Sequence, residues 1–132
     1  MRTIIIASLL LLTACTTTPA TTPTTVAETL LSANLTLTDR GPVTQPFLTV
    51  EGHVYEVDGG ELQLYTYATD VAAQADAAKI SPAGEIEGTM VHWMAQPHFY
   101  RRGNTLAIYV GASQMTLDAL QRTLGAPFAE HP

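Results

Sequence analysis

Apolar and polar residues alternate along two neighbouring segments in the middle of the chain. Residues 47–57 are rich in β-branched and aromatic side chains, and residues 61–67 continue the alternation. A period of two is typical of β-strands. Between the segments, Asp58-Gly59-Gly60 supplies residues that favour a tight hairpin turn. The pattern predicts an antiparallel hairpin in which Gly52 marks a bulge.

The second half of the chain shows a similar arrangement. Residues 89–95 and 106–110 have strand-like patterns, and Arg102-Gly103-Asn104 is a turn signal before the second of them. Pro97 is expected to end or bend the first strand.

A helical segment follows each hairpin. Residues 71–79 are rich in alanine and can be capped by Thr69 or Asp70. Residues 114–124 can be capped by Ser113, and their leucines share one helical face. Because the helices follow hairpins, the pattern predicts an α+β fold with an antiparallel sheet of about four strands and two helices on one face.

The two strand–strand–helix segments also have similar sequences. His53-Val54-Tyr55 corresponds to His98-Phe99-Tyr100, 45 residues later, and a strand and a helix follow each. One interpretation is a duplicated strand–strand–helix unit. The other is that two hairpins with the same burial pattern converged.

The N-terminal segment has a different character. Met1-Arg2 is a short positive region, and residues 4–12 are almost wholly apolar. This run is too short for a membrane-spanning helix, which needs roughly 20 residues, and has the length of a secretory signal. Leu12-Thr13-Ala14-Cys15 follows and resembles the lipobox of bacterial lipoproteins.

The lipobox resemblance implies a defined maturation. Signal cleavage falls between Ala14 and Cys15, the Cys15 thiol carries diacylglycerol, and the new amino group is often acylated with a fatty acid such as palmitate. Two or three acyl chains hold a protein firmly on a bilayer. Thr16 stands where an Asp would favour retention at the inner membrane. The expected location is the outer membrane of a diderm, or the outer leaflet of the cytoplasmic membrane of a monoderm.

Residues 16–29 are dominated by Thr, with two Pro. Such a stretch cannot build a core and is expected to be a spacer, either bare or O-glycosylated. The predicted organisation is a signal peptide over 1–14, a lipidated Cys15 and tether over 15–29, and one small domain over 30–132. A helical turn or two is expected at 28–33.

Composition and motifs exclude several functions. The formal net charge is −6, which argues against nucleic-acid binding, and the single Cys excludes a multi-thiolate metal site. The chain has no glycine-rich phosphate loop, no G-x-S-x-G motif and no H-E-x-x-H motif. We therefore expect a protein that is not an enzyme and that has no cofactor and no metal.

A binding face is predicted from the aromatic residues. If both helices cover the Leu/Ile/Val side of the sheet, its tyrosines face solvent, where such residues form interaction hot spots. The alternative is that residues 30–48 cover this face and the tyrosines form a second small core. The segment 97–100 either plugs a core edge or forms a ligand lip, and the basic pair after it either grips an anion or is a solvated hairpin tip. The candidate binding residues are Tyr65, Tyr67, Trp93, His98, Tyr100, Arg101 and Tyr109.

Histidines and methionines are possible metal ligands. The histidines are His53, His92, His98 and His131. They could meet in a zinc or copper site, or simply hydrogen-bond to the backbone. Met90 and Met94 flank Trp93 and are expected to fill core space rather than to bind metal.

The motifs Ile80-Ser81-Pro82-Ala83-Gly84, Val91-His92-Trp93, Pro97-His98-Phe99-Tyr100 and Tyr109-Val110-Gly111 resemble a group of small bacterial envelope proteins, usually lipoproteins, without a characterised activity. The resemblance implies class and location. The expected function is a non-enzymatic binding module of the envelope. Its expected partners are the bilayer, through Cys15, and an envelope protein or glycan. Alternatives are a small-ligand or metal sensor that uses histidines, and an envelope enzyme with an unrecognised site.

Overall fold

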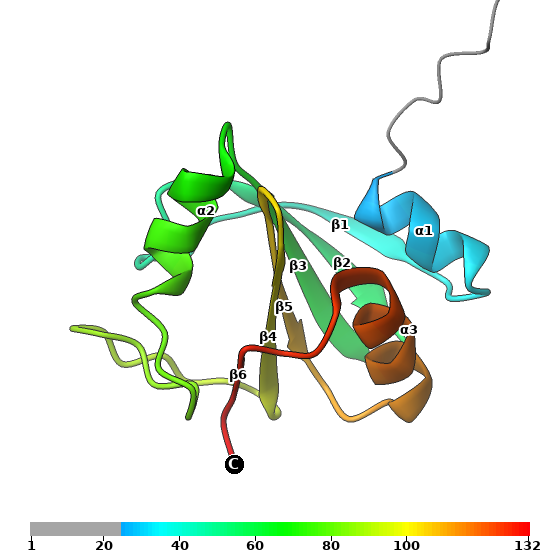
Figure 1. Ribbon diagram of the computed structural model, residues 1–132. Coiled ribbons are helices and arrows are strands. Elements are labelled where there is room, and N and C mark those ends of the chain that lie inside the picture. The colour runs from blue at the N-terminus through cyan, green and yellow to red at the C-terminus, as the bar shows by residue number, and fades with distance from the viewer. Residues whose placement is uncertain (1–24) are drawn as a thin grey trace, which may run out of the picture.

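The computed structural model describes residues 25–132, so the lipobox and Cys15 lie outside the described residues. This part of the chain forms one antiparallel sheet with helices on both sides (Figure 1). The elements, in chain order, are α1 (Val26–Ser32), β1 (Thr38–Val43), β2 (Gly52–Val57), β3 (Gly60–Thr66), α2 (Asp70–Ala77), β4 (Pro97–Arg102), β5 (Thr105–Val110), α3 (Gln114–Leu124) and β6 (Ala129–Glu130). Among these residues no helix is long and apolar enough to cross a membrane.

The sheet has the order β1-β2-β3-β5-β4-β6, and all neighbours are antiparallel. The α+β class and the antiparallel sheet are confirmed, but the described sheet has six strands rather than about four. The four central strands form two hairpins, with turns at Asp58-Gly59 and Gly103-Asn104. Both turns and the strands after them were expected, but β2 begins at Gly52 rather than at 47, and the first strand of the second hairpin is β4 rather than the segment 89–95. Asp58, Gly59 and Gly103 have positive φ angles of 50°, 74° and 55°, which explains the choice of residues there.

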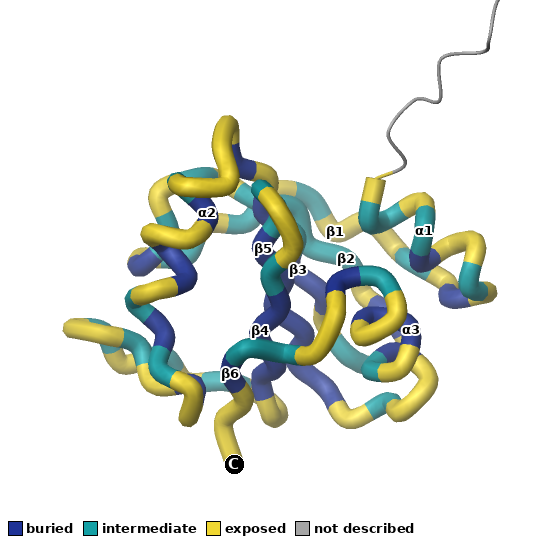
Figure 2. Tube along the Cα trace, viewed as in Figure 1, coloured by how far each residue is buried: buried dark blue, intermediate teal, exposed yellow. Residues whose placement is uncertain are grey.

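Each face of the sheet carries its own core (Figure 2). We call one the α2 face; its buried residues are Phe47, Tyr65, Tyr67, Ala73, Ala77, Ile80, Phe99, Leu106, Ile108, Val110 and Ala129. The other is the α3 face, which α1 also covers; its buried residues are Leu30, Leu35, Val57, Leu62, Tyr100, Ala107, Tyr109, Ala119, Leu120 and Leu124.

The expectation of both helices on one face is wrong. The register between β3 and β5 places Leu62 opposite Tyr109, and Tyr65 opposite Leu106. Because cross-strand partners point to the same side, leucine and tyrosine mix on both faces. Both faces of the central strands are therefore apolar, and each needs its own cover.

The two strand–strand–helix units do not form a symmetric pair. A rotation that exchanges β3 with β5 and β2 with β4 would keep each face of the sheet on the same side. The two helices would then share a face, whereas α2 and α3 lie on opposite faces. The structure favours the second interpretation, convergence of two hairpins with similar letters.

The boundaries of the helices follow local signals. Helix α3 begins after its Ser113 cap and ends before Gly125, as the sequence predicts. Helix α1 begins at Val26 with a capping box between Thr25 and Glu28. Residues 26–29, assigned to the tether from composition, thus belong to this helix.

Chain without regular structure closes the rest of the α2 face, and a buried carboxylate holds it. Asp76 on α2 is 2% exposed. Its carboxylate accepts hydrogen bonds from the Thr49 N–H (2.7 Å), the Thr49 hydroxyl (2.8 Å), the Tyr67 hydroxyl (2.9 Å) and Lys79 (2.7 Å). Burial alone would raise the pKa of Asp76, but these hydrogen bonds outweigh it and the pKa is lowered. Asp76 thereby fastens the 44–50 loop to the helix.

Candidate functional site

Residues 88–96, which we call the 88–96 loop, cross the α2 face without joining the sheet. The strand expected at 89–95 is therefore wrong. Strand β4 already has β5 on one side and β6 on the other, so the 88–96 loop cannot pair with β4. Its alternation nevertheless persists, with Val91 and Trp93 packed against the core of the α2 face. The Trp93 ring meets Phe99 edge-to-face, with centroids 5.9 Å apart.

The next segment was also misassigned. Pro97 opens strand β4 rather than ending a strand, and residues 97–102 pair with β5 along their whole length. A proline is compatible with the first position of a strand because its missing N–H breaks no ladder bond. The segment 97–100 is thus buried in an inner strand, and Pro97 alone among its residues borders the hollow described next.

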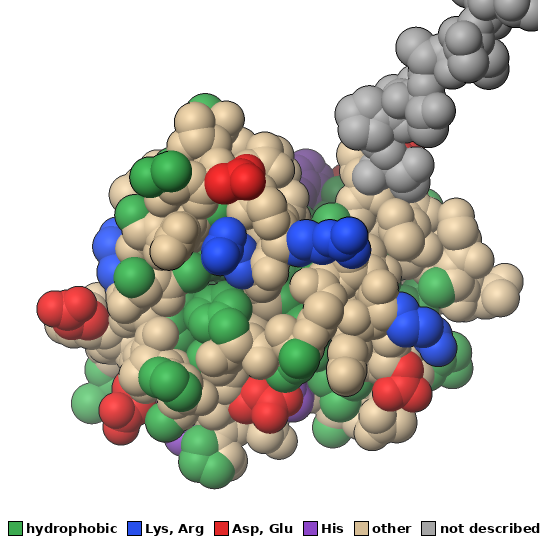
Figure 3. All heavy atoms as spheres, in the orientation of Figure 1, with side chains coloured by type: hydrophobic (Ala, Val, Ile, Leu, Met, Phe, Trp, Pro, Cys, Tyr) green, Lys and Arg blue, Asp and Glu red, His purple; other side chains and the backbone are tan. Residues whose placement is uncertain are grey.

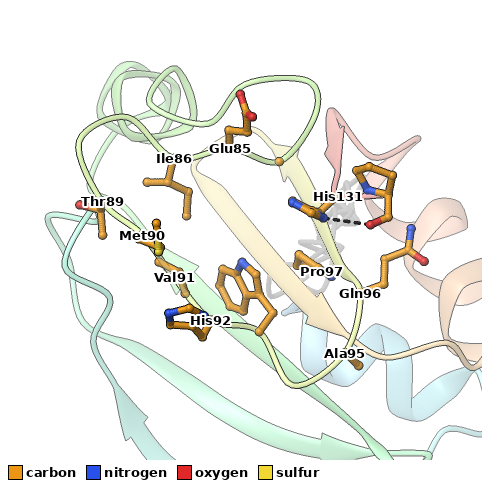
Figure 4. Close-up of a pocket in the computed structure, with 13 residues that line it drawn as sticks. Glu85, Ile86, Thr89, Met90, Val91, His92, Ala95, Gln96, Pro97 and His131 are labelled. Carbon is orange, nitrogen blue, oxygen red and sulfur yellow. Dashed lines mark hydrogen bonds between the residues drawn. The ribbon is translucent and has the colours of Figure 1, made fainter.

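A first hollow lies between the 88–96 loop and the C-terminal residues (Figure 4). Its volume is about 920 Å³. Ile86, Val91 and Pro97 provide apolar wall, and His131 stands on the C-terminal side with its Nδ1 3.0 Å from the Pro132 carbonyl oxygen. Polar side chains share the lining of the first hollow, namely Glu85, Thr89, His92, Gln96 and His131. A concave surface that combines apolar wall with polar groups is typical of binding sites.

A second hollow, of about 580 Å³, lies on the other side of the same loop. Its floor includes Gln63, which is 3% exposed. The Gln63 carbonyl oxygen accepts hydrogen bonds from the Tyr65 hydroxyl (2.7 Å) and the Gln45 amide (3.0 Å), and its amide donates to Glu61 (2.5 Å). These polar groups already satisfy one another. Residues 91–93 line both hollows, so the loop is the wall between them.

The methionines of the 88–96 loop face solvent. Met90 is 83% exposed and Met94 is 99% exposed, while His92 between them is exposed as well. The expectation that these methionines fill core space is wrong, since Val91 and Trp93 take the inward positions. The Met-Val-His-Trp-Met alternation could have shown this, because an extended segment over one apolar surface buries only alternate residues.

The predicted aromatic binding face does not exist as an exposed surface. Tyr65 and Tyr67 are buried on the α2 face, whereas Tyr100 and Tyr109 are buried on the α3 face. The tyrosines are therefore core residues, but they are divided between the two cores and do not form the single second core of the alternative. Burial raises the pKa of the Tyr65 and Tyr67 hydroxyls, and raises that of Tyr100 to about 12. Of the candidate aromatic residues, the half-buried Trp93 borders the hollows.

His92 and His131 both line the first hollow, whereas His53 and His98 lie elsewhere. His98 is buried, with Nδ1 3.0 Å from a Glu130 carboxylate oxygen and Nε2 3.2 Å from the Gly111 carbonyl oxygen. His53 pairs with Asp39, Nε2 lying 2.8 Å from a carboxylate oxygen. The Gly41 N–H and then His53 lower the pKa of Asp39. Across residues 25–132, no three side chains of His, Cys, Asp or Glu gather to hold a metal ion.

The basic pair at the β4–β5 turn makes only backbone hydrogen bonds. Arg101 donates to the Gly103 carbonyl oxygen (3.1 Å), and Arg102 donates to the Thr123 carbonyl oxygen (2.8 Å). Arg102 also borders a third hollow of about 440 Å³ between α1 and α3, together with Arg122. Arg101 and Arg102 thus lie at the end of the β4–β5 hairpin and not beside the 88–96 loop.

Comparisons of the chain with protein-family models, curated proteins and solved structures find no match. The function is therefore inferred from the geometry of the described residues and from the sequence of the N-terminal segment.

Proposed function

We propose that the protein is a lipid-anchored bacterial envelope protein whose domain is a non-enzymatic binding module. The binding surface is the 88–96 loop with the first and second hollows beside it. The partner is an envelope protein or glycan, and Cys15 supplies the membrane anchor. The lipobox-like Leu12-Thr13-Ala14-Cys15 and the Thr-rich stretch after it support the anchor.

The exposure of Met90 and Met94 is the observation that carries the binding role. Large apolar side chains exposed next to concave surface are typical of interaction sites. Methionine is flexible and polarisable, so it adapts to a partner's surface. Trp93 fixes the loop from below by its contact with Phe99.

The position of helix α1 is compatible with this surface. Helix α1, the first described element after the tether, packs on the α3 face. The 88–96 loop lies on the α2 face, on the other side of the sheet (Figure 1). Helix α1 thus leaves the proposed binding surface uncovered.

The anchor is tested by intact mass and by fractionation. We expect the protein extracted from membranes to lack residues 1–14 and to carry acyl chains on Cys15. The Cys15→Ser variant should keep its signal segment and show no acyl mass. A mature wild-type protein without acyl chains would contradict the proposal.

The binding surface is tested by photo-crosslinking in intact cells. A photoreactive residue at Met94 is expected to give a discrete adduct with an envelope component, identified by mass spectrometry. Met115 is a matched control because it is also an exposed methionine, at 56%, but lies on α3. Equal adducts from both positions, or none from Met94, would argue against a specific surface on the 88–96 loop.

A further inference from the structure

Three side chains with metal-binding atoms alternate along the 88–96 loop. Met90, His92 and Met94 occupy every second position, and all three are exposed. Residues 90–93 contain no turn or bend, and the chain bends at Met94 and Ala95. Because Val91 and Trp93 pack inward against the core, the two thioethers and the imidazole all point outward.

The hollows place His92 in the middle of the three. His92 lines both hollows, whereas Met90 lines the first and Met94 lines the second. Figure 4 shows Met90 and His92 along the same stretch of the loop. Residues two apart in an extended chain are separated by roughly 7 Å. Each methionine has several rotatable bonds, which let its sulfur swing toward the central imidazole.

The loop backbone is free to adjust around such a centre. Within residues 25–132, the backbone of residues 90–95 makes no hydrogen bond with other backbone groups. The indole of Trp93 nevertheless holds the middle of the segment on Phe99. The outer side chains are thus supported from below but not locked by a sheet ladder.

We propose that Met90, His92 and Met94 bind a soft monovalent metal ion, Cu(I). Thioether sulfur is a soft ligand that favours Cu(I) over hard cations, and imidazole also suits copper. Hard cations such as Mg²⁺ and Ca²⁺ need oxygen ligands instead. This proposal deepens the proposed function by naming a ligand class for the same loop, and rests on it for the biological use of the site.

The local charge is compatible with a cation. No Lys or Arg lies between Lys79 and Arg101, whereas Glu85 and Glu87 fall in that interval. In Figure 3, acidic side chains lie along the lower left edge of the molecule, where Figure 1 shows the segment before β4. Arg40, which lines the second hollow, is already paired with Glu56. The electrostatic environment of the loop thus favours metal binding.

The test uses the full chain with Cys15→Ser, in detergent, because this removes the single thiol, itself a strong Cu(I) ligand. Cu(I) is titrated under reducing conditions against a chromogenic Cu(I) chelator. Trp93 is the only tryptophan, so its fluorescence reports binding at the loop itself. Ag(I), which has the same soft character, provides a second probe in a separate titration without reductant, because a reductant would deposit it as silver metal.

We expect the protein to take one Cu(I) from the chelator and Trp93 fluorescence to change in parallel. Met90→Leu, Met94→Leu and His92→Gln should each weaken binding by about 10- to 100-fold, the loss typical even of outer-sphere partners, or more. Met115→Leu should have no effect. All four positions are exposed, so the variants are expected to fold, which circular dichroism checks.

Equal Cu(I) affinity of the wild type and the Met90→Leu/Met94→Leu double variant would overturn the proposal. Tight Zn²⁺ binding without Cu(I) binding would also overturn it, because thioethers would then not be the ligands. The crosslinking of Met94 in cells is a separate measurement. If Met94 crosslinks to a partner but the protein does not bind Cu(I), the proposed binding module stands and the metal site is refuted. If the protein binds Cu(I) but Met94 gives no adduct, the metal site stands and the binding module is refuted.

Discussion

The two faces of the sheet are covered in different ways. On the α3 face, a capped eleven-residue helix and α1 lie over the strands and bury mainly aliphatic and tyrosine side chains. On the α2 face, an eight-residue helix rich in alanine covers only part of the core. The 44–50 loop and the 80–96 segment cover the rest, and both larger hollows lie there.

This difference suggests that the two faces of the sheet have different roles, one in stabilising the domain and one in binding a partner. A helix makes most of its own backbone hydrogen bonds, and the hollow on the α3 face, about 440 Å³ between α1 and α3, is the smallest of the three described. Cover by irregular chain needs polar ties such as Asp76, and leaves hollows and exposed side chains beside them. The α3 face is thus expected to carry more of the stability, and the α2 face the variable, binding part of the molecule.

The largest expected effect is on the α3 face. Leu120 is 0% exposed, so Leu120→Ala should lower the free energy of unfolding by about 2–5 kcal/mol. Ile86→Ala, in the half-buried segment over the α2 face, should cost clearly less because solvent already reaches it. Urea denaturation of the wild type, Leu120→Ala and Ile86→Ala measures both losses of unfolding free energy. If Ile86→Ala proves the more damaging change, the division of roles between the faces is wrong.

A smaller effect is expected from the polar tie on the α2 face. Asp76→Asn keeps the shape but weakens the acceptor for Thr49, Tyr67 and Lys79. The loss should be about 1–3 kcal/mol at neutral pH. Thr49→Val, which removes only the hydroxyl donor at that carboxylate, should cost less. Hydrogen exchange is expected to show faster opening of α2 in the Asp76→Asn protein, with α3 little changed.

The same carboxylate predicts a pH dependence. The folded-state pKa of Asp76 is lowered, so its contribution is fully present above the unfolded value of about 4. It is lost as the pH falls through the lower folded-state pKa. The stability gap between the wild type and Asp76→Asn should therefore shrink as the pH falls below about 4. A gap that stays constant down to strongly acidic pH would mean that the carboxylate charge is not the stabilising feature.

The sequence predicted those elements whose signals are local. Helix α3 has a cap, an apolar stripe and a terminal glycine, and its predicted bounds match the structure. The turn at Asp58-Gly59 is similarly determined by its own residues. Strand β1, in contrast, has an exposed and weakly apolar sequence, and it forms because the edge of β2 is available to it. Pairing of this kind depends on the whole fold.

The candidate site was only partly predictable for the same reason. The alternation around Trp93 was visible, but it indicated a strand, because periodicity does not say whether a segment pairs with neighbours or lies over them. Which side of β3 shares a face with Leu106 depends on the β3–β5 register, which no local signal specifies. The tyrosines were consequently placed on an exposed face, and the methionines in a core.

The helix caps offer the finest comparison of the two faces. The Ser113 hydroxyl accepts from the Thr116 N–H at 3.4 Å and also donates to Asp58 at 2.6 Å, which ties α3 to the β2–β3 turn. The Thr69 hydroxyl accepts from the Ala72 N–H at 3.1 Å and caps α2 only. Removing a cap costs typically about 1 kcal/mol.

We therefore expect Ser113→Ala to lower the unfolding free energy by about 1 kcal/mol or somewhat more, and Thr69→Ala by about 1 kcal/mol or less. The Asp58→Asn variant is the matched control, because it keeps an acceptor for Ser113 and leaves the cap of α3 intact. Urea denaturation gives the global values, and hydrogen exchange separates the helices. A larger global loss from Thr69→Ala would show that the α2 face, despite its irregular cover, stabilises the domain as much as the helix-covered face does.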